Sequence, residues 1–340
     1  MKAKNFLSLR PLAFSHSLMS PFAPLIEQTH AVELLTQAVA KDRLAPAYLF
    51  AGASGVGRQL AAECFLTLLF SAGKGAIAPT EALRQRLQQR NHPDLLWVAP
   101  TYLHQGKRLS IVEAADAGLK PKTPPVVRLE QIREIARFLS RAPLEASRSV
   151  VVIDHAETMA EGAANGLLKT LEEPGQATLI LIAPGTESLL PTLVSRCQRI
   201  PFYRLSVSGM AQVLERSGQS EILQRPEVLQ LAQGSPGAAI AHWQQLQAMP
   251  ADLLQAITQP PRTVRQALSL ARDIDKALEP EAQRWLIDYL QQTYWQQSCT
   301  IAHQLPNATP ISLLEKARQY LMRNVQPRLV WEVTLMGMVR

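Results

Sequence analysis

The stretch "AYLFAGASGVGRQLAAECFLTLLF", residues 47–70, places a short apolar run, a glycine-rich loop and a helical pattern in direct succession. Residues 47–52 predict a buried strand, and apolar positions from Leu60 to Leu69 recur on one face of a helix. Strand, glycine loop and helix are the setting that a phosphate-binding loop requires, because backbone N–H groups and the positive end of the helix then face an anion.

The loop keeps the glycines of the pattern G-x-x-x-x-G-K-[ST] but not its last two residues. Gly52, Gly55 and Gly57 are present. Arg58 stands at the lysine position, and Gln59 stands at the Ser/Thr position. In a working site the lysine reaches the terminal phosphates and the hydroxyl holds magnesium. A planar guanidinium is bulkier than an ammonium, and the amide of Gln59 is a poor substitute for the metal contact.

The acidic residue expected at the end of a second strand is present, but its usual neighbour is not. The segment "VVVIDHAETM" places Asp154 after an apolar run, and His155 follows where a water-orienting glutamate is usual. Three chemical positions are therefore substituted together, which argues against intrinsic ATP hydrolysis. Weak binding of ATP or ADP at the loop and Asp154 stays open, and so does the interpretation that the loop is only a tight strand-to-helix turn.

More apolar runs alternate with helical patterns along the first part of the chain. They lie at 94–100, 149–154, 178–184 and, more weakly, 198–203. This alternation predicts an α/β domain with a five-stranded parallel sheet covered on both faces. After about residue 204 the strand signals stop, and amphipathic segments predict helices to the end of the chain.

The composition is that of a globular protein with a mild excess of positive charge. The chain has 35 Lys and Arg against 28 Asp and Glu, a net charge of +7, and 47% hydrophobic residues. This charge is compatible with work near nucleic acid but does not establish it. No apolar run approaches the roughly twenty residues of a membrane span. Cys64, Cys197 and Cys299 form no C-x-x-C pair, which favours a reducing cytoplasm.

Four segments together carry a resemblance to a known family. They are "NHPDLLWVAP" (91–100), "GLLKTLEEP" (166–174), "LLPTLVSRCQRIPF" (189–202) and "NVQPRLVWEV" (324–333). The chain resembles the delta-prime subunits of bacterial DNA polymerase III clamp loaders, and cyanobacterial members most of all. The resemblance runs from about residue 20 to the end of the chain.

The resemblance implies an AAA+ fold in three parts. These are an α/β domain over 20–203, a helical lid over 204–248 and a helical collar over 249–340 that serves oligomerisation. Residues 1–19 are then a tail outside the domains, and translation from Met19 is one interpretation of it.

The resemblance also implies a chain that does not turn over ATP itself. It places Arg196, within the motif Ser195-Arg196-Cys197, against the nucleotide of a neighbouring gamma/tau subunit in a hetero-pentameric ring. A guanidinium supplied in trans stabilises the charge on a transferred phosphoryl group. Outside this context Arg196 would be interpreted as a surface ion-pair residue. The other implied partners are the delta subunit, the sliding clamp and primer–template DNA, with no membrane involved.

The chain departs from the family at one point, and two other functions stay open. Many members carry a four-cysteine zinc module after the first helix, but residues 71–97 contain no cysteine, so we expect no zinc.

Nothing in the sequence resembles a polymerase active site, so polymerase activity would belong to the holoenzyme. The alternatives are an independent P-loop ATPase with Arg58 in place of lysine, acting on nucleic acid, and a nucleic-acid-binding module that uses the basic surface.

Overall fold

The computed structural model describes residues 21–72, 81–119, 123–300, 309–323 and 325–339. The predicted tail, 1–19, lies outside these ranges. The chain divides into two compact units, Met1–Tyr203 and Arg204–Arg340. In the described part of the chain, no helix combines the length and the apolar character needed to cross a membrane.

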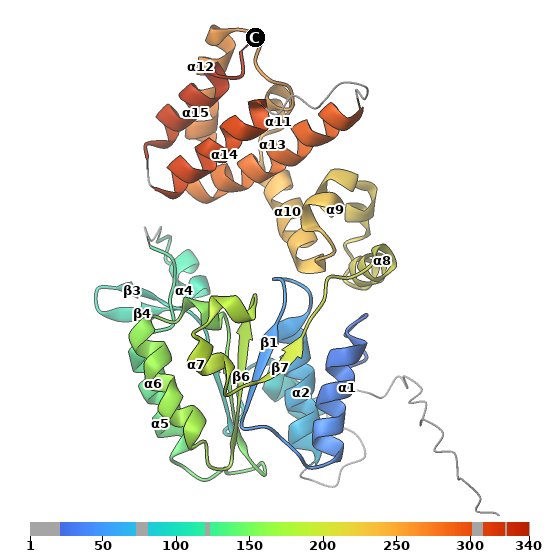
Figure 1. Ribbon diagram of the computed structural model, residues 1–340, viewed down its shortest axis with the longest axis vertical. Helices are drawn as coiled ribbons and strands as arrows, with labels where there is room; N and C mark the ends of the chain where they lie inside the picture. The colour runs from blue at the N-terminus through green and yellow to red at the C-terminus, as the bar shows by residue number, and fades with distance from the viewer. Residues whose placement is uncertain (1–20, 73–80, 120–122, 301–308, 324, 340) are drawn as a thin grey trace, which may run out of the picture. The chain divides into compact units, whose positions relative to one another are not determined.

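The first unit is built on a five-stranded parallel sheet with the strand order β2-β5-β6-β1-β7 (Figure 1). The strands are β1 (Ala47–Ala51), β2 (Leu95–Val98), β5 (Ser149–Ile153), β6 (Ala177–Ala183) and β7 (Gln198–Pro201). They confirm all five predicted apolar runs. In register, Leu49 of β1 lies opposite Leu181 of β6 on one side and Arg199 of β7 on the other.

Helices cover both faces of this sheet, which explains why its central strands are apolar throughout. The helices of the first unit are α1 (Thr29–Ala40), α2 (Arg58–Ala72), α3 (Glu81–Gln88), α4 (Ile111–Asp116), α5 (Leu129–Leu139), α6 (Glu161–Glu172) and α7 (Pro191–Val194), with short 3₁₀ turns η1 (Ala156–Thr158) and η2 (Thr186–Ser188). Leu49 and Leu181 share a buried cluster with side chains of α5, α6 and α7. Tyr48 and Phe50 point to the other face and contact Phe65 of α2. The unit is therefore a three-layer α/β domain.

A β-hairpin that the sequence analysis did not predict lies between the second and third sheet strands. β3 (Tyr102–His104) pairs antiparallel with β4 (Lys107–Leu109). Gln105 and Gly106 join them with φ angles of 48° and 78°, the positive values that a two-residue type I′ turn needs. The Gln-Gly pair was the available signal, but its flanking strands are too short and too polar to show an alternating pattern.

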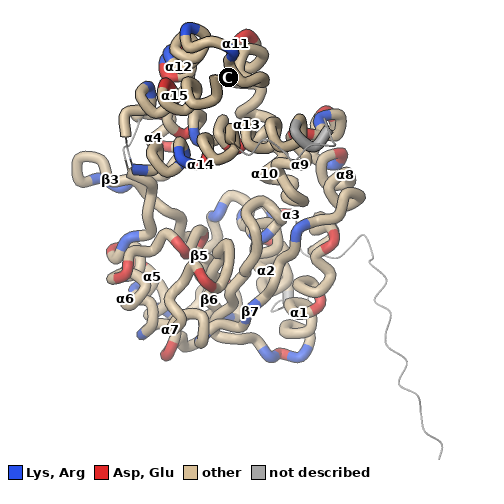
Figure 2. The backbone as a smooth tube through the Cα atoms, turned by 45° about the horizontal axis from the view of Figure 1, so that its top comes forward, with Lys and Arg blue, Asp and Glu red and all other residues tan. Residues whose placement is uncertain are grey.

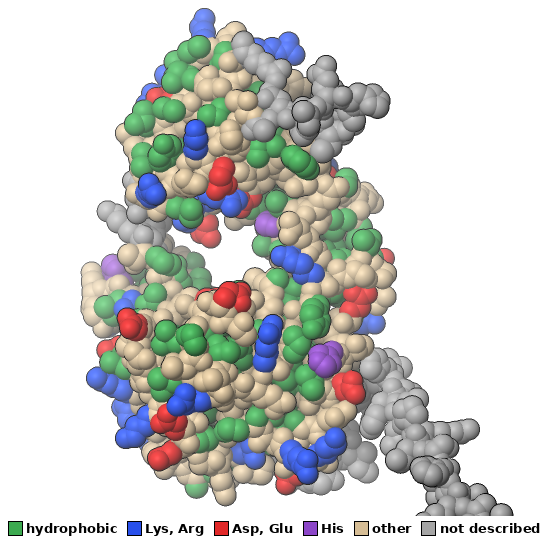
Figure 3. Space-filling model, in the orientation of Figure 1, with side chains coloured by type: hydrophobic (Ala, Val, Ile, Leu, Met, Phe, Trp, Pro, Cys, Tyr) green, Lys and Arg blue, Asp and Glu red, His purple; other side chains and the backbone are tan. Residues whose placement is uncertain are grey.

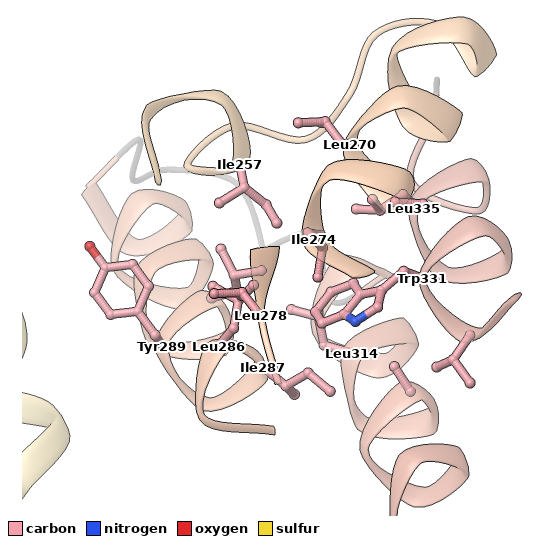
Figure 4. Close-up of a cluster of buried hydrophobic side chains, with 14 of the residues drawn as sticks. Ile257, Leu270, Ile274, Leu278, Leu286, Ile287, Tyr289, Leu314, Trp331 and Leu335 are labelled. Atoms are coloured by element: carbon pink, nitrogen blue, oxygen red, sulfur yellow. The ribbon is translucent and has the colours of Figure 1, made fainter. Parts of the chain in front are cut away.

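The second unit is helical throughout its described residues, as predicted. Its helices are α8 (Val207–Arg216), η3 (Ser220–Gln224), α9 (Pro226–Ala232), α10 (Pro236–Ala248), α11 (Ala251–Ile257), α12 (Val264–Ala277), α13 (Pro280–Thr300), α14 (Thr309–Met322) and α15 (Pro327–Met336). The last five enclose a core that includes the fully buried Trp331 (Figure 4). Its indole Nε1 donates to Gln283 Oε1 at 2.8 Å, so the polar end of the buried ring is satisfied. The further division into a lid (204–248) and a collar (249–340) stays a prediction.

Asp94, in the "NHPD" segment before β2, anchors the chain that leads into β5. Its side chain is 2% exposed. It accepts hydrogen bonds from three consecutive backbone N–H groups, those of Leu144 (2.6 Å), Glu145 (2.8 Å) and Ala146 (2.7 Å). Burial acts against the charged form, but these three bonds outweigh it and lower the pKa of Asp94. The carboxylate therefore stabilises the fold as an anion.

We expect Asp94→Asn to lower the free energy of unfolding by about 1–3 kcal/mol, because the amide of this buried side chain offers only one acceptor oxygen to three backbone donors. The pKa of Asp94 is depressed in the folded state. Its contribution is therefore complete above the ordinary aspartate pKa of about 4 and is lost as the pH falls through the folded-state pKa. Urea unfolding at several pH values measures both effects. The exposed Asp116→Asn is the matched control, and a stability of Asp94→Asn equal to that of the wild type at neutral pH would contradict this role.

Candidate functional site

The glycine loop joins the end of β1 to the start of α2 in a conformation that depends on its glycines. Gly55 and Gly57 have φ angles of 77° and 102°, which side-chain-bearing residues rarely adopt. A Cβ on Gly52 would lie 2.4 Å from the carbonyl oxygen of Phe202, just after β7. The backbone N–H of Gly52 also bonds to the carbonyl oxygen of Ala183 at the end of β6 (3.3 Å). The geometry supports the interpretation of the loop as a tight turn packed under neighbouring strands.

The two residues at the magnesium positions are hydrogen-bonded to each other. Gln59 Nε2 donates to Asp154 Oδ2, and Asp154 Oδ1 accepts from the backbone N–H of His155 at 3.0 Å. Asp154 is 5% exposed. An amide donor therefore satisfies this buried carboxylate in the place of a cation, and Gln59 has no hydroxyl to offer a metal. This set of donors does not fit a magnesium-bound nucleotide.

Arg58, at the lysine position, is buried, with 7% of its surface exposed. Burial lowers the pKa of Arg58, and the charges of Glu157 and Asp154 act in the opposite direction. The carboxylates of the same unit thus offset only part of the cost of burying its charge. Its Nη1 is buried and has no hydrogen-bond partner among the residues that the structure describes, so one donor beside the loop is unsatisfied. Weak binding of ATP or ADP without a metal therefore stays a prediction.

His155 and Glu157 complete this edge of the sheet. His155 has a left-handed backbone with a φ of 48°, and its Nδ1 lies 3.1 Å from Glu157 Oε1. This hydrogen bond is the main cause that raises the pKa of His155, and the negative charges of Asp154 and Glu157 add to it. Burial acts against the charge of Glu157, but its bond to His155 helps to lower its pKa overall. The position of the usual glutamate therefore holds an imidazole engaged within its own unit.

The Ser195-Arg196-Cys197 segment lies at the opposite edge of the sheet. It forms the turn between α7 and β7, where the backbone N–H of Arg196 bonds to the carbonyl oxygen of Leu193 (3.1 Å). Because β7 runs parallel to β1, this turn precedes the amino ends of the strands, whereas the glycine loop and Asp154 follow their carboxyl ends. The five residues of β1 span about 16 Å between the two edges. Arg196 is therefore remote from the glycine loop of its own chain.

Arg196 is partly exposed and is held at two of its nitrogens. Its side chain is 37% exposed. Nη2 donates to Glu172 Oε1 at 2.7 Å, and Nη1 donates to the carbonyl oxygen of Thr192 at 3.0 Å. Cys197 packs against the apolar cluster of the sheet, and burial raises the pKa of its thiol to about 11. Arg196 thus forms the ion pair expected of a surface arginine and also remains accessible.

The fold brings the predicted loop residues and Asp154 together at one edge and keeps Arg196 apart from them. The sequence analysis did not predict two acidic contacts at these sites, that of Glu157 with His155 and that of Glu172 with Arg196, although Glu172 lies in the quoted segment 166–174. Glu157 lay two residues after His155 in a segment already singled out, so its proximity was a signal that could have been used. Glu172 lies 24 residues before Arg196, and only the path of α6 back along the sheet brings the two together.

The His, Cys, Asp and Glu side chains were also compared with the requirements of metal sites and reactive thiols. No cluster of three or more His, Cys, Asp or Glu side chains suited to a metal occurs within the described ranges, and the expected absence of zinc stays a prediction. Burial raises the pKa of Cys64 to about 12, which makes it a poor nucleophile. The side chain of Cys299 lies outside the described part of the chain.

A solved structure has the same fold as this chain. It is the DNA polymerase III gamma subunit-related protein of Thermotoga maritima, with a TM-score of 0.52 and 16% sequence identity over 90% of this chain and 97% of that chain. The five-stranded sheet, the glycine loop after β1 and the helical second unit show the AAA+ fold.

Family models cover almost all of the described chain. Residues 27–206 match the model described as DNA polymerase III, delta subunit, and residues 208–338 match the cyanobacterial DNA polymerase III delta prime C-terminal domain. The chain belongs to the DNA polymerase III delta-prime family.

Curated relatives agree with this assignment. The delta' subunit of Bacillus subtilis is 36% identical over 181 residues, which are 52% of this chain and 48% of the relative. The delta' subunit of Pseudomonas aeruginosa is 33% identical over 211 residues, 60% of this chain and 57% of the relative. The tau subunit of Bacillus subtilis is 26% identical over 207 residues, 61% of this chain and 33% of the relative. This chain thus matches about half the length of the delta' relatives.

We expect Glu157→Gln to return the pKa of His155 toward the ordinary value of about 6.5, because the hydrogen bond to Glu157 is the main cause of its rise. Because its pKa is raised in the folded state, protonated His155 stabilises the fold below about pH 6.5. This contribution is lost as the pH rises through the folded-state pKa. The variant should therefore lose less stability than the wild type between mildly acidic and mildly alkaline pH. An NMR titration of His155 measures the shift, with His242 in the second unit as the internal control. An unchanged pKa of His155 in Glu157→Gln would contradict the assigned cause.

Proposed function

We propose that this chain is the non-hydrolysing delta-prime subunit of a replicative clamp loader, which supplies Arg196 in trans to a neighbouring gamma/tau ATPase. The observation that carries the proposal is the separation of the two sites. Arg196 is accessible at the amino edge of the sheet, and the glycine loop lies at the carboxyl edge of the same sheet. Arg196 therefore reaches a bound nucleotide only if that nucleotide is held by another subunit.

The glycine loop supports the same proposal from the other side. Its magnesium positions are taken by the bond between Gln59 and Asp154, and Arg58 is buried, with its charge only partly offset by Glu157 and Asp154. Such a loop offers no free ligand for the magnesium ion that would align and neutralise a transferred phosphoryl group. These residues therefore favour the delta-prime proposal over the alternative of an independent ATPase.

The proposed partners are gamma/tau and delta subunits in a hetero-pentameric ring, the sliding clamp and primer–template DNA. Similarity to delta' and tau proteins supports the subunit partners. Lys and Arg positions are interspersed with Asp and Glu positions over both units (Figure 2), which gives no support to a nucleic-acid-binding module based on one basic face. We expect a cytoplasmic location, in agreement with the cysteine pattern.

Exposed apolar side chains support protein partners for both units (Figure 3). On α15, Leu329, Val333 and Met336 are 50%, 54% and 37% exposed and recur at helical spacing. The neighbouring α12 exposes Val264 and Leu268. Such residues in the predicted collar (249–340) are suited to burial against other subunits. In the first unit, a smaller exposed set comprises Leu103, Ile111 and Val112.

We expect Arg196→Ala to leave folding and ring assembly intact but to slow hydrolysis at the neighbouring site by about 10³-fold or more, the usual effect of losing an arginine finger. Total turnover of the reconstituted complex should fall by at least the share of that site, and clamp loading should fall with it. Arg196→Lys should fail as well, because an ammonium cannot reproduce the planar fork. Arg199→Ala, three residues along on β7, is the control. Unchanged turnover with Arg196→Ala would remove this residue from the mechanism.

We expect Val333→Asp to weaken assembly with the partner subunits by at least about tenfold, because a charge would enter a buried apolar contact. The stability of the isolated chain should change by no more than about 0.5 kcal/mol, since this side chain is exposed in the monomer. Val207→Asp, at an 87% exposed position on α8, is the control. Sedimentation of the mixed subunits measures assembly, and wild-type assembly by Val333→Asp would exclude this face of α15 from the interface.

A further inference from the structure

The arginine proposed to act in trans is already restrained before any partner arrives. Its Nη2 donates to Glu172 Oε1 (2.7 Å) and its Nη1 donates to the carbonyl oxygen of Thr192 (3.0 Å). Two bonds to two different terminal nitrogens define the plane of the guanidinium. A guanidinium has five N–H donors, so three remain for a phosphate.

Both anchors belong to elements that the core of the first unit holds in place. Glu172 is the last residue of α6, directly after Leu171, which is 4% exposed in the sheet cluster. Thr192 belongs to α7, directly before the fully buried Leu193 of the same cluster. α6 and α7 contact each other. The carboxylate and the carbonyl oxygen are therefore fixed relative to the strand that follows Arg196.

We propose that Glu172 is a positioning residue, which holds the Arg196 guanidinium in the orientation that the neighbour's nucleotide meets. This inference rests on the proposed function of Arg196. A free arginine side chain has many rotamers, and ordering it at the moment of reaction would raise the barrier. The bond to Glu172 restricts those rotamers in advance. The neighbouring carboxylate, Glu173, instead ends α6 through its backbone N–H, which bonds to the carbonyl oxygen of Lys169 at 3.3 Å.

The test uses the reconstituted clamp-loader complex with Glu172→Ala, Glu172→Gln, Glu173→Ala and Arg196→Ala. An exposed pair of this kind is worth a factor of about two to five. We expect Glu172→Ala to lower the turnover number of the neighbouring site by that factor with an unchanged KM for ATP. Glu172→Gln keeps an acceptor oxygen and should restore most of the turnover, and Glu173→Ala should behave as the wild type. In the Arg196→Ala background, Glu172→Ala should have no further effect.

Several outcomes would overturn the inference. These are wild-type or faster turnover with Glu172→Ala, an equal loss with Glu173→Ala, or an additive loss in the double variant. Thermal unfolding of Glu172→Ala at the wild-type temperature separates positioning from a general loss of structure. If Arg196→Ala itself leaves turnover unchanged, the proposed function fails. If Arg196→Ala abolishes the neighbour's turnover while Glu172→Ala does not lower it, only the role of Glu172 fails.

Discussion

The parallel pairing of β1 with β7 is the constraint on which the rest of the molecule depends. Parallel strands place all their carboxyl ends at one edge of a sheet and all their amino ends at the other. The glycine loop follows β1, whereas Arg196 precedes β7. The length of a strand therefore separates the two, and no rotamer of Arg196 closes that distance. A site that combines a phosphate loop with this arginine has to be built from two subunits.

The loop keeps the shape of a phosphate-binding loop but not the residues of its metal site, because different residues determine the two. Gly52 is required by the close approach of Phe202, and Gly55 and Gly57 by their positive φ angles. These requirements come from the path of the backbone and hold with or without a nucleotide. The metal positions carry no such restraint, and there Gln59 donates directly to Asp154. The buried carboxylate of Asp154 needs a hydrogen-bond or ionic partner, and here the amide of Gln59 is that partner in place of a cation.

Much of this fold could be predicted from the sequence because a sheet buried on both faces produces continuous apolar runs. β6, whose seven residues are all buried, is the clearest example. The β3–β4 hairpin was missed because its short strands are polar and largely exposed. The glycine loop was identified from a local pattern. The pairing of Arg196 with Glu172 could not be identified in this way, because it depends on how α6 and α7 pack and not on a fixed spacing in the sequence. The helices of the second unit followed from their periodicity, but periodicity does not say where a lid ends and a collar begins.

Phosphate release with magnesium and ATP, measured for the chain alone and then after addition of the partner ATPase subunits, shows which of the two hydrolyses ATP. We expect no release above background from the chain alone, and an increased turnover by the partner subunits when the chain joins them. Magnesium-dependent release from the chain alone, abolished by Arg58→Ala, would contradict this expectation.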